Sequence, residues 1–179
     1  MHPLRLFAYC PRCGSSAFVD NDEKSRRCAS CGFVYYLNPA AAVVALITDA
    51  DGRLLVCRRG REPARGTLDL PGGFIDMHET AEEGLAREVR EETGLTVTRA
   101  DYLFSLPNVY PYSGFDVHTL DLFFRVTTLP DDRPTAMDDA AELMYVALDD
   151  LRPEDFGLDS IRRGIEKLLI MENGQSLRK

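Results

Sequence analysis

A short acidic segment, residues 73–95, constrains this chain more than any other part of it. Three of its glutamates, Glu88, Glu91 and Glu92, stand at positions i, i+3 and i+4. A helix places side chains with this spacing next to one another on one face. Like charges at such close range repel unless a cation neutralises them, and carboxylate oxygens suit hard ions. The segment therefore predicts a helix that carries a site for Mg²⁺ or Mn²⁺.

Both ends of this helix are marked in the sequence. Thr80, followed three residues later by Glu83, is the pattern of a capping box at a helix N-terminus. Gly94 stands where a glycine commonly ends a helix. Between them, Leu85 and Val89 supply an apolar stripe. We therefore expect a helix between Thr80 and Gly94 that packs through this stripe.

Arg87 lies among the carboxylates of the same helix. It can pair with Glu83 one turn earlier and with Glu91 one turn later. Such a pair would fix the orientation of Glu91. Ahead of the helix, the Leu-Pro-Gly-Gly of residues 70–73 allows a tight turn, so a backbone carbonyl there could point at the same metal ion.

The segment resembles the Nudix box, G-x5-E-x7-R-E-U-x-E-E-x-G-U, in which U is an aliphatic residue. All nine positions are filled, by Gly73, Glu79, Arg87, Glu88, Val89, Glu91, Glu92, Gly94 and Leu95. The resemblance implies an α/β/α sandwich with a mixed sheet. It also implies a metal-dependent hydrolase that cuts the phosphoanhydride of nucleoside diphosphates linked to another group. A solvated acidic helix face is the alternative explanation of the charge run.

The same resemblance implies roles for single residues. The metal ligands for Mg²⁺ or Mn²⁺ would be the Gly72 carbonyl, Glu88, Glu91, Glu92 and Asp139. The catalytic residues would be Arg87, Glu91 and Glu142, with Glu91 either a further ligand or a base. Asp139 and Glu142 are included because relatives place an acidic residue shortly before the last strand. A solvated loop carboxylate is the alternative for each of these two.

Four cysteines near the N-terminus form two C-x2-C pairs, each followed by a glycine: Cys10, Cys13, Cys28 and Cys31. This spacing is typical of a site that wraps four thiolates around one Zn²⁺. Because no ligand position stays open for water, we expect a structural ion; disulfides are the alternative. We expect a small zinc ribbon at residues 1–38 and a Nudix hydrolase domain at residues 39–179.

A zinc ribbon ahead of a Nudix domain resembles the NADH pyrophosphatase branch of the family. That branch carries the motif SQPWPFPxS eleven residues past the glycine of the box. Here residues 105–113 read SLPNVYPYS, with departures at Leu106 and Asn108. The resemblance implies NADH, NAD⁺ or ADP-ribose as substrate. A nucleotide-sensing regulator and a housecleaning nucleoside triphosphate pyrophosphatase are the alternatives.

Three side chains outside the box are candidates for holding a substrate. Arg58 could reach a phosphate, and Tyr110 and Phe115 could stack on a base. Solvation of the arginine and simple packing of the rings are the alternatives. Both rings fall in residues 107–116, PNVYPYSGFD, which we expect to be a loop because they hold two prolines and a glycine.

The other patterns predict ordinary elements. We expect a hairpin of strands 40–47 and 53–58 around a turn at 49–52, then strands at 95–106, 117–127 and 142–148. We expect a closing helix that starts at Asp159 or Ser160 and ends before Gly174. Cys57 lies in an apolar run and is expected to be a packed thiol and not a nucleophile.

Composition limits the partners. The formal net charge of −8 argues against a general nucleic-acid-binding protein, which normally shows a basic face. The longest apolar run, residues 40–47, is too short to span a bilayer, and no leader pattern precedes it. We therefore expect a cytoplasmic protein that binds a small-molecule nucleotide, with no nucleic-acid or membrane partner. The resemblance adds a possible homodimer.

Overall fold

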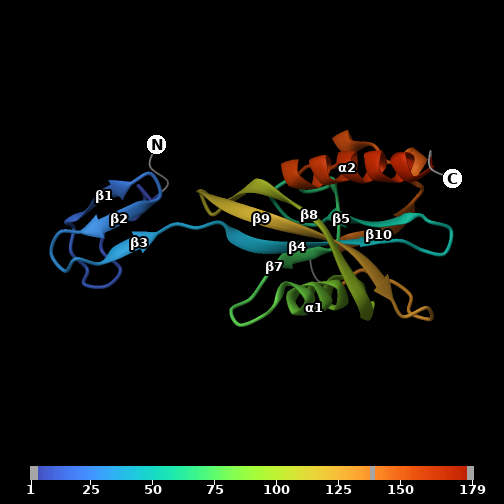
Figure 1. Cartoon of the computed structure of the whole chain (residues 1–179), viewed down its shortest axis with the longest axis horizontal. Coiled ribbons are helices and arrows are strands. Elements are labelled where there is room, and N and C mark those ends of the chain that lie inside the picture. Colours follow the sequence, from blue (N-terminus) through green and yellow to red (C-terminus); the bar gives the residue numbers. More distant parts are fainter. Residues whose placement is uncertain (1–3, 138–139, 177–179) are drawn as a thin grey trace. The chain divides into compact units, whose positions relative to one another are not determined.

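The computed structural model describes residues 4–137 and 140–176, and Figure 1 shows its helices and strands. The chain divides into two compact units, Met1–Pro39 and Ala40–Lys179, which we describe one at a time. Asp139, one of the expected metal ligands, lies outside the described residues. Neither helix in the described part of the chain is long and apolar enough to cross a membrane.

The first unit contains a small antiparallel sheet. Its strands are β1 (Phe18–Asp22), β2 (Ser25–Cys28) and β3 (Val34–Tyr36), in the spatial order β1-β2-β3. Its core is a single cluster in which Phe18 packs against Cys10 and Cys28, with Cys31 and Phe33 beside them. An apolar core this small leaves the unit in need of another source of stability, such as a structural metal ion.

The second unit contains two sheets. Its strands are β4 (Ala40–Ile47), β5 (Leu54–Arg59), β6 (Leu68–Asp69), β7 (Gly72–Phe74), β8 (Val97–Tyr112), β9 (Phe115–Thr128) and β10 (Ala140–Val146). The larger sheet has the order β7-β4-β9-β8 and the smaller one the order β10-β5-β6. Strands β4 and β9 pair in parallel. Strand β7 pairs antiparallel with β4, and β8 pairs antiparallel with β9, so the larger sheet is mixed.

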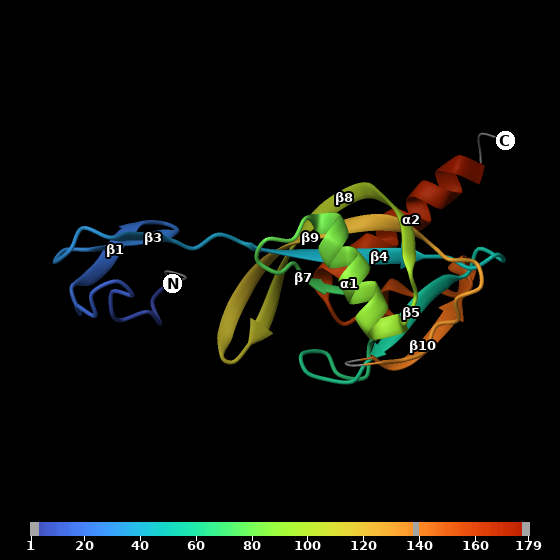
Figure 2. The same ribbon diagram turned by 90° about the horizontal axis from the view of Figure 1, so that it is seen from below.

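Two helices, α1 (Ala81–Thr93) and α2 (Asp159–Ser176), cover opposite faces of the larger sheet, as Figures 1 and 2 show. Successive side chains of a strand point to opposite faces, and β4 uses both of them. Val43 belongs to one core cluster with Leu85 of α1. Val44, the next residue, belongs to the other cluster, with Ile165 of α2. The expected α/β/α sandwich with a mixed sheet is confirmed.

Helix α1 starts and ends as its sequence predicts. Thr80 accepts the N–H of Glu83 with its hydroxyl, and the Glu83 carboxylate accepts the N–H of Thr80, which completes the capping box. Gly94 has the left-handed φ of 72° and donates its N–H to the carbonyl of Arg90. Leu85 and Val89 are fully buried, so the predicted stripe is the packed face.

The expected loop at residues 107–116 is wrong, because these residues continue a long hairpin. Strand β8 runs to Tyr112 and β9 begins at Phe115, with only Ser113 and Gly114, both at positive φ, between them. Strand β8 is an edge strand of its sheet. An edge strand tolerates proline because the N–H groups on its outer side have no partner strand. Pro107 and Pro111 therefore do not end the strand.

Three smaller expectations also need correction. The turn at residues 49–52 exists, but β4 and β5 belong to different sheets and meet only at the bridge between Thr48 and Leu54. The last strand is Ala140–Val146, followed by short 3-10 turns at Leu148–Asp150 and Pro153–Asp155. Gly174 lies inside α2 and does not follow its end.

Candidate active site

The second unit contains a cavity of about 450 Å³. This volume is in the range that holds small-molecule ligands. Its lining comes from β4, the end of β5 and the residues after it, β7, α1, the tip of the β8–β9 hairpin and the start of α2. The cavity therefore collects residues from nearly every element of the sandwich.

Two glycines let the chain pass close to α1. Gly72 has a φ of 151°, and a Cβ there would overlap the carbonyl oxygen of Val43. A Cβ at Gly73 would lie 2.6 Å from the carboxyl carbon of Glu88. The Gly72 N–H donates to Glu92 Oε2 at 3.0 Å. The expected tight turn at residues 70–73 is thus replaced at Gly72 and Gly73 by the start of strand β7, which passes close to Glu88 and Glu92; both glycines and both glutamates line the cavity.

Arg87 neutralises the acidic face of α1. Its Nε donates to Glu79 Oε1 at 2.8 Å, and its Nη1 donates to Glu88 Oε1 at 2.7 Å and to Glu91 Oε2 at 3.1 Å. These carboxylates, Glu79 above all, raise the pKa of Arg87 above its ordinary value. The expected pair with Glu91 is confirmed. The expected pair with Glu83 is wrong, because the Glu83 carboxylate closes the capping box.

Aromatic side chains form one wall of the cavity. Tyr110 and Tyr112 of β8 stack at 6.3 Å between ring centroids, with 26° between their planes. The ring of Phe74 meets Tyr110 edge-on at 6.0 Å, and the Arg59 guanidinium lies 6.0 Å from the Tyr110 centroid. All four residues line the cavity. This wall presents faces on which a planar ring can stack.

The other two expected substrate residues occupy different positions. Arg58 lines the cavity, but its Nε donates to Glu142 Oε2 at 3.2 Å and its Nη1 to the Gly66 carbonyl at 2.9 Å. Phe115 is not among the residues that line the cavity; it stands across from Tyr112 at the hairpin tip. Glu142 likewise does not line it and is engaged with Arg58.

Buried polar groups form the inner part of the cavity. Arg59 is paired with Asp69, whose other oxygen accepts the N–H of Leu70 at 2.8 Å. Further along, Asp121 of β9 accepts hydrogen bonds from the hydroxyls of Thr119 and Ser160. Burying so many polar groups together costs free energy unless they serve a ligand or one another.

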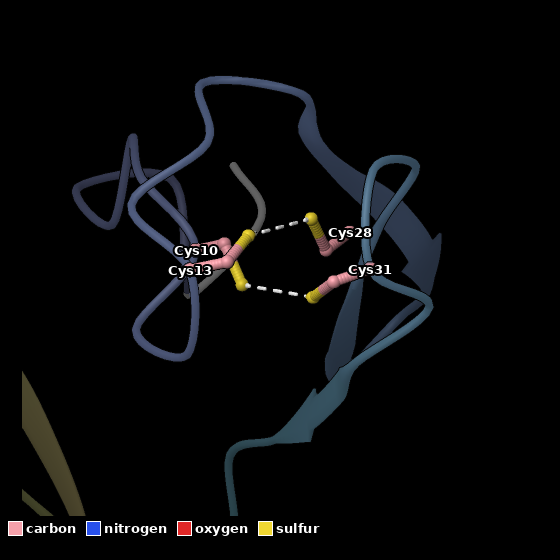
Figure 3. A group of neighbouring side chains, drawn as sticks. All are labelled: Cys10, Cys13, Cys28 and Cys31. Carbon is pink, nitrogen blue, oxygen red and sulfur yellow. Dashed lines mark hydrogen bonds between the residues drawn. The ribbon is translucent and has the colours of Figure 1, made fainter.

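Figure 3 shows the four cysteines of the first unit with their sulfur atoms facing one another. The sulfurs of Cys10 and Cys31 are 3.8 Å apart, and those of Cys13 and Cys28 are 3.7 Å apart. A disulfide would need about 2.05 Å. Four thiolates at about 2.3 Å from one Zn²⁺ form a tetrahedron with edges of about 3.8 Å, so the arrangement fits a bound zinc ion.

The two turns that carry the cysteines repeat the same hydrogen bonds. The N–H of Gly14 donates to the Cys10 carbonyl at 2.8 Å, and the N–H of Gly32 donates to the Cys28 carbonyl at 2.9 Å. Both glycines have left-handed φ angles, 72° and 74°. Such turns direct the backbone so that both cysteines of a pair face one point.

The family model described as "NUDIX domain" matches residues 38–168 of this chain. The chain belongs to the Nudix family. The NAD-capped RNA hydrolase NudC of Vibrio atlanticus is 26% identical over 167 residues, which cover 84% of this chain and 61% of that relative. The chain thus spans less than two thirds of that relative's length. The ADP-ribose pyrophosphatase of Methanocaldococcus jannaschii is 35% identical over 118 residues, 65% of this chain and 66% of that enzyme.

Among solved structures, a NUDIX hydrolase from Nitrosomonas europaea has a similar fold. Its TM-score is 0.72 at 22% identity, with 93% of this chain and 92% of that chain covered. At this identity the similarity concerns the fold alone. It covers a larger share of this chain than the family model does, because that model begins at residue 38.

The carboxylates of this Nudix domain do not all face the same way. Glu88 and Glu92 line the cavity, and burial raises the pKa of Glu88 above its ordinary value. Glu91 does not line it; its side chain is 51% exposed and is held by Arg87. Among residues 4–137 and 140–176, only the four cysteines gather closely enough to form a metal-binding cluster. The cavity itself offers two carboxylates, Glu88 and Glu92, beside Gly72 and Gly73 of β7, and oxygen donors of this kind suit a hard divalent ion.

Sequence reasoning missed Asp69, Asn108, Thr119 and Asp121 as cavity residues. Three of them stand in β8 and β9, at positions that alternate with apolar or exposed neighbours. A polar residue on the buried face of a strand is a usable signal, because such groups need partners. At Asn108 this alternation of polar and apolar residues does not count as a strand signal when residues 107–116 are taken as a loop.

Cys57 lies in the cavity floor and is buried. Burial raises the pKa of its thiol, so the thiol stays protonated at neutral pH. This agrees with the expectation of a packed thiol and not a nucleophile.

Proposed function

We propose that this protein is a metal-dependent pyrophosphohydrolase that cuts the diphosphate of a dinucleotide or an ADP-ribose-type substrate. The observation that carries the proposal is the composition of one cavity. Glu88 and Glu92 stand against Gly72 and Gly73 of β7 on one part of its wall, and the rings of Tyr110 and Tyr112 form another. A nucleoside diphosphate needs both, because it combines a charged diphosphate with a planar base.

Glu88, Glu92 and the backbone of Gly72 would hold Mg²⁺ or Mn²⁺. When bound, such ions neutralise a diphosphate and make water a better nucleophile. The chain's own residues prepare the site. Arg87 holds Glu88 and Glu91 in place, and Glu91 stays a candidate base or further ligand. Arg58 and Arg59 line the same cavity but are paired with Glu142 and Asp69, and carboxylates outnumber arginines in its lining, so an anionic substrate would depend on the bound metal ions.

Two further assignments belong to this proposal. The first unit would be a zinc ribbon whose Zn²⁺ is structural, bound by Cys10, Cys13, Cys28 and Cys31. The substrate would be NADH, NAD⁺ or ADP-ribose, which the names of the two relatives support. Because one relative is named for NAD-capped RNA, the expectation of no nucleic-acid partner needs a direct test.

The test is product analysis on NADH, NAD⁺, ADP-ribose, a diadenosine polyphosphate and a short NAD-capped RNA, with Mg²⁺ or Mn²⁺. We expect hydrolysis of at least one of them, with mononucleotide products, and its loss with EDTA. Glu92→Gln should lower kcat/KM by more than about 100-fold, because a ligand matters at least as much as the groups that orient it. Glu82→Gln, an exposed residue of the same helix, is the matched control.

A nucleotide-sensing regulator predicts a different result. The protein would then bind a nucleotide tightly, hydrolyse none of the panel, and behave the same with Glu92→Gln. That outcome would overturn the enzymatic proposal. Hydrolysis of canonical nucleoside triphosphates alone would instead move the assignment to a housecleaning enzyme.

A further inference from the structure

Asn108 is a largely buried polar residue whose side-chain amide faces the cavity. It lies in β8, is only 8% exposed, and lines the cavity. Its amide makes no hydrogen bond with any residue in 4–137 or 140–176, yet neither of its polar atoms is sealed from solvent, so the amide faces the open space of the cavity. A ligand that fills this space would displace the water there and leave the amide unsatisfied unless it offers a partner. The free amide therefore points to a ligand that satisfies it.

The residue across from Asn108 supports this reading. Thr119 of β9 is paired with it in the hairpin register and is also buried against the cavity. The Thr119 hydroxyl donates its proton to Asp121 at 2.5 Å, and Asp121 accepts a second bond from Ser160. Because the proton of Thr119 is already committed, its oxygen can only accept. Asn108 can thus both donate and accept hydrogen bonds, whereas the hydroxyl oxygen of Thr119 beside it can only accept them.

The same strand supplies a stacking surface next to this pair. Residues 108, 110 and 112 alternate along β8, so Asn108 and the rings of Tyr110 and Tyr112 share one face of the strand. All three line the cavity, whereas Val109 between them does not and is 46% exposed. A planar ring bound against Tyr110 would therefore lie next to Asn108 on this face.

We propose that Asn108 determines substrate specificity by hydrogen bonding to the substrate. The part of the substrate that it recognises carries a hydrogen-bond donor next to an acceptor, at the edge of a planar ring. An asparagine amide matches such an edge with two bonds. Two parts of the proposed substrates carry it: the amino-pyrimidine edge of adenine and the carboxamide of nicotinamide. The inference rests on the proposed function only for the identity of the ligand, because the free amide and the cavity are independent of catalysis.

The experiment compares Asn108→Leu and Asn108→Ala with the parent. Leucine has the same number of side-chain heavy atoms as asparagine, so it keeps the shape and removes both hydrogen-bonding groups. Val109→Ala, on the opposite side of the same strand, is the control for effects on folding, and thermal melts of all variants check stability. Steady-state kinetics are measured with NADH and with ADP-ribose, which lacks nicotinamide.

We expect both Asn108 variants to raise KM about 10-fold or more with kcat little changed, since one or two ligand hydrogen bonds are lost. If the amide contacts adenine, both substrates are affected equally. If it contacts the carboxamide, NADH alone is affected. Variants that match Val109→Ala for both substrates would overturn the inference.

The two proposals can fail separately. If the parent hydrolyses neither substrate, the proposed function fails, and calorimetric titration of NAD⁺ and ADP-ribose then tests the subsite alone. Binding that is weakened about 10-fold by Asn108→Leu supports the subsite in that case. Binding that Asn108→Leu leaves unchanged, or the absence of any binding, contradicts it.

Discussion

At the scale of single residues, Arg87 explains how α1 tolerates its own charge. Carboxylates at i, i+3 and i+4 repel one another, yet the guanidinium of Arg87 bonds Glu79, Glu88 and Glu91 at once. A planar fork with five donors can do this, whereas an ammonium group cannot. Arg87 therefore offsets part of the negative charge of the helix, which keeps an excess of glutamates over arginines, and a metal ion would compete with Arg87 for Glu88.

Removing this guanidinium should destabilise the second unit. We expect Arg87→Ala to lower the free energy of unfolding by about 1–3 kcal/mol, because the partly buried carboxylates of Glu79 and Glu88 lose a shared partner. Arg87→Lys should keep only part of the free energy of unfolding that Arg87→Ala loses. Arg90→Ala is the control: Arg90 is exposed, its one side-chain bond goes to Thr96, and we expect less than about 0.5 kcal/mol. Urea unfolding measures all three, and equal losses for Arg87→Ala and Arg90→Ala would refute the argument.

At the scale of elements, the N-terminus of α1 depends on one reciprocal pair. The backbone N–H of Thr80 holds the pKa of Glu83 below its ordinary value. A group with a lowered folded pKa stabilises the protein above its unfolded pKa, near 4.5, and this contribution is lost as pH falls through the lowered value. The capping box should therefore weaken in acid.

This dependence can be measured with Glu83→Ala. We expect its melting temperature to lie about 2–4 °C below that of the parent at pH 7. The gap should shrink as the pH drops below 4. Glu82→Ala controls for charge near the helix N-terminus, because Glu82 is in the same turn but outside the capping box. A gap that stays constant with pH would show that the Glu83 charge is irrelevant.

The elements also show what a sequence can and cannot predict here. Helix α1 and its two caps depend on contacts within a few residues, so local spacing predicts them, whereas Gly72 and Gly73, expected in a turn, lie in strand β7 against Val43 and Glu92. The cavity depends on contacts between distant residues. Thr119 and Asp121 meet Ser160 only after β9 and α2 have packed, about forty residues apart in sequence. Residues 107–116 were misjudged because proline ends a central strand but is tolerated at an edge, and edge position is decided by the whole sheet.

At the scale of the molecule, each unit has a core of its own. The cluster around Phe18 contains residues of the first unit only, and the two large clusters contain residues of the second unit only. The proposed metal ions also differ in kind, since thiolates select Zn²⁺ and carboxylates select Mg²⁺ or Mn²⁺. The two units should therefore respond separately to metal removal.

A zinc-selective chelator should unfold the first unit and spare the second. We expect one Zn²⁺ per chain by elemental analysis, and its removal should collapse the amide NMR signals of residues 4–39 while those of the second unit persist. Cys28→Ser should lose the zinc. Cys57→Ser, which removes the one cysteine outside the cluster, should keep it. A first unit that stays folded without zinc would contradict this prediction.

Ser160 lies in the first turn of helix α2, and its hydroxyl donates a hydrogen bond to the carboxylate of Asp121, which lines the cavity. The first turn of α2 is thereby connected to the cavity through the hydrogen bond between Ser160 and Asp121. A shift of this helix would therefore move Asp121, and with it the polar lining of the cavity, without any change in the side chains that line it. A comparison of substrate ranges among Nudix proteins should consider this anchor as well as the box.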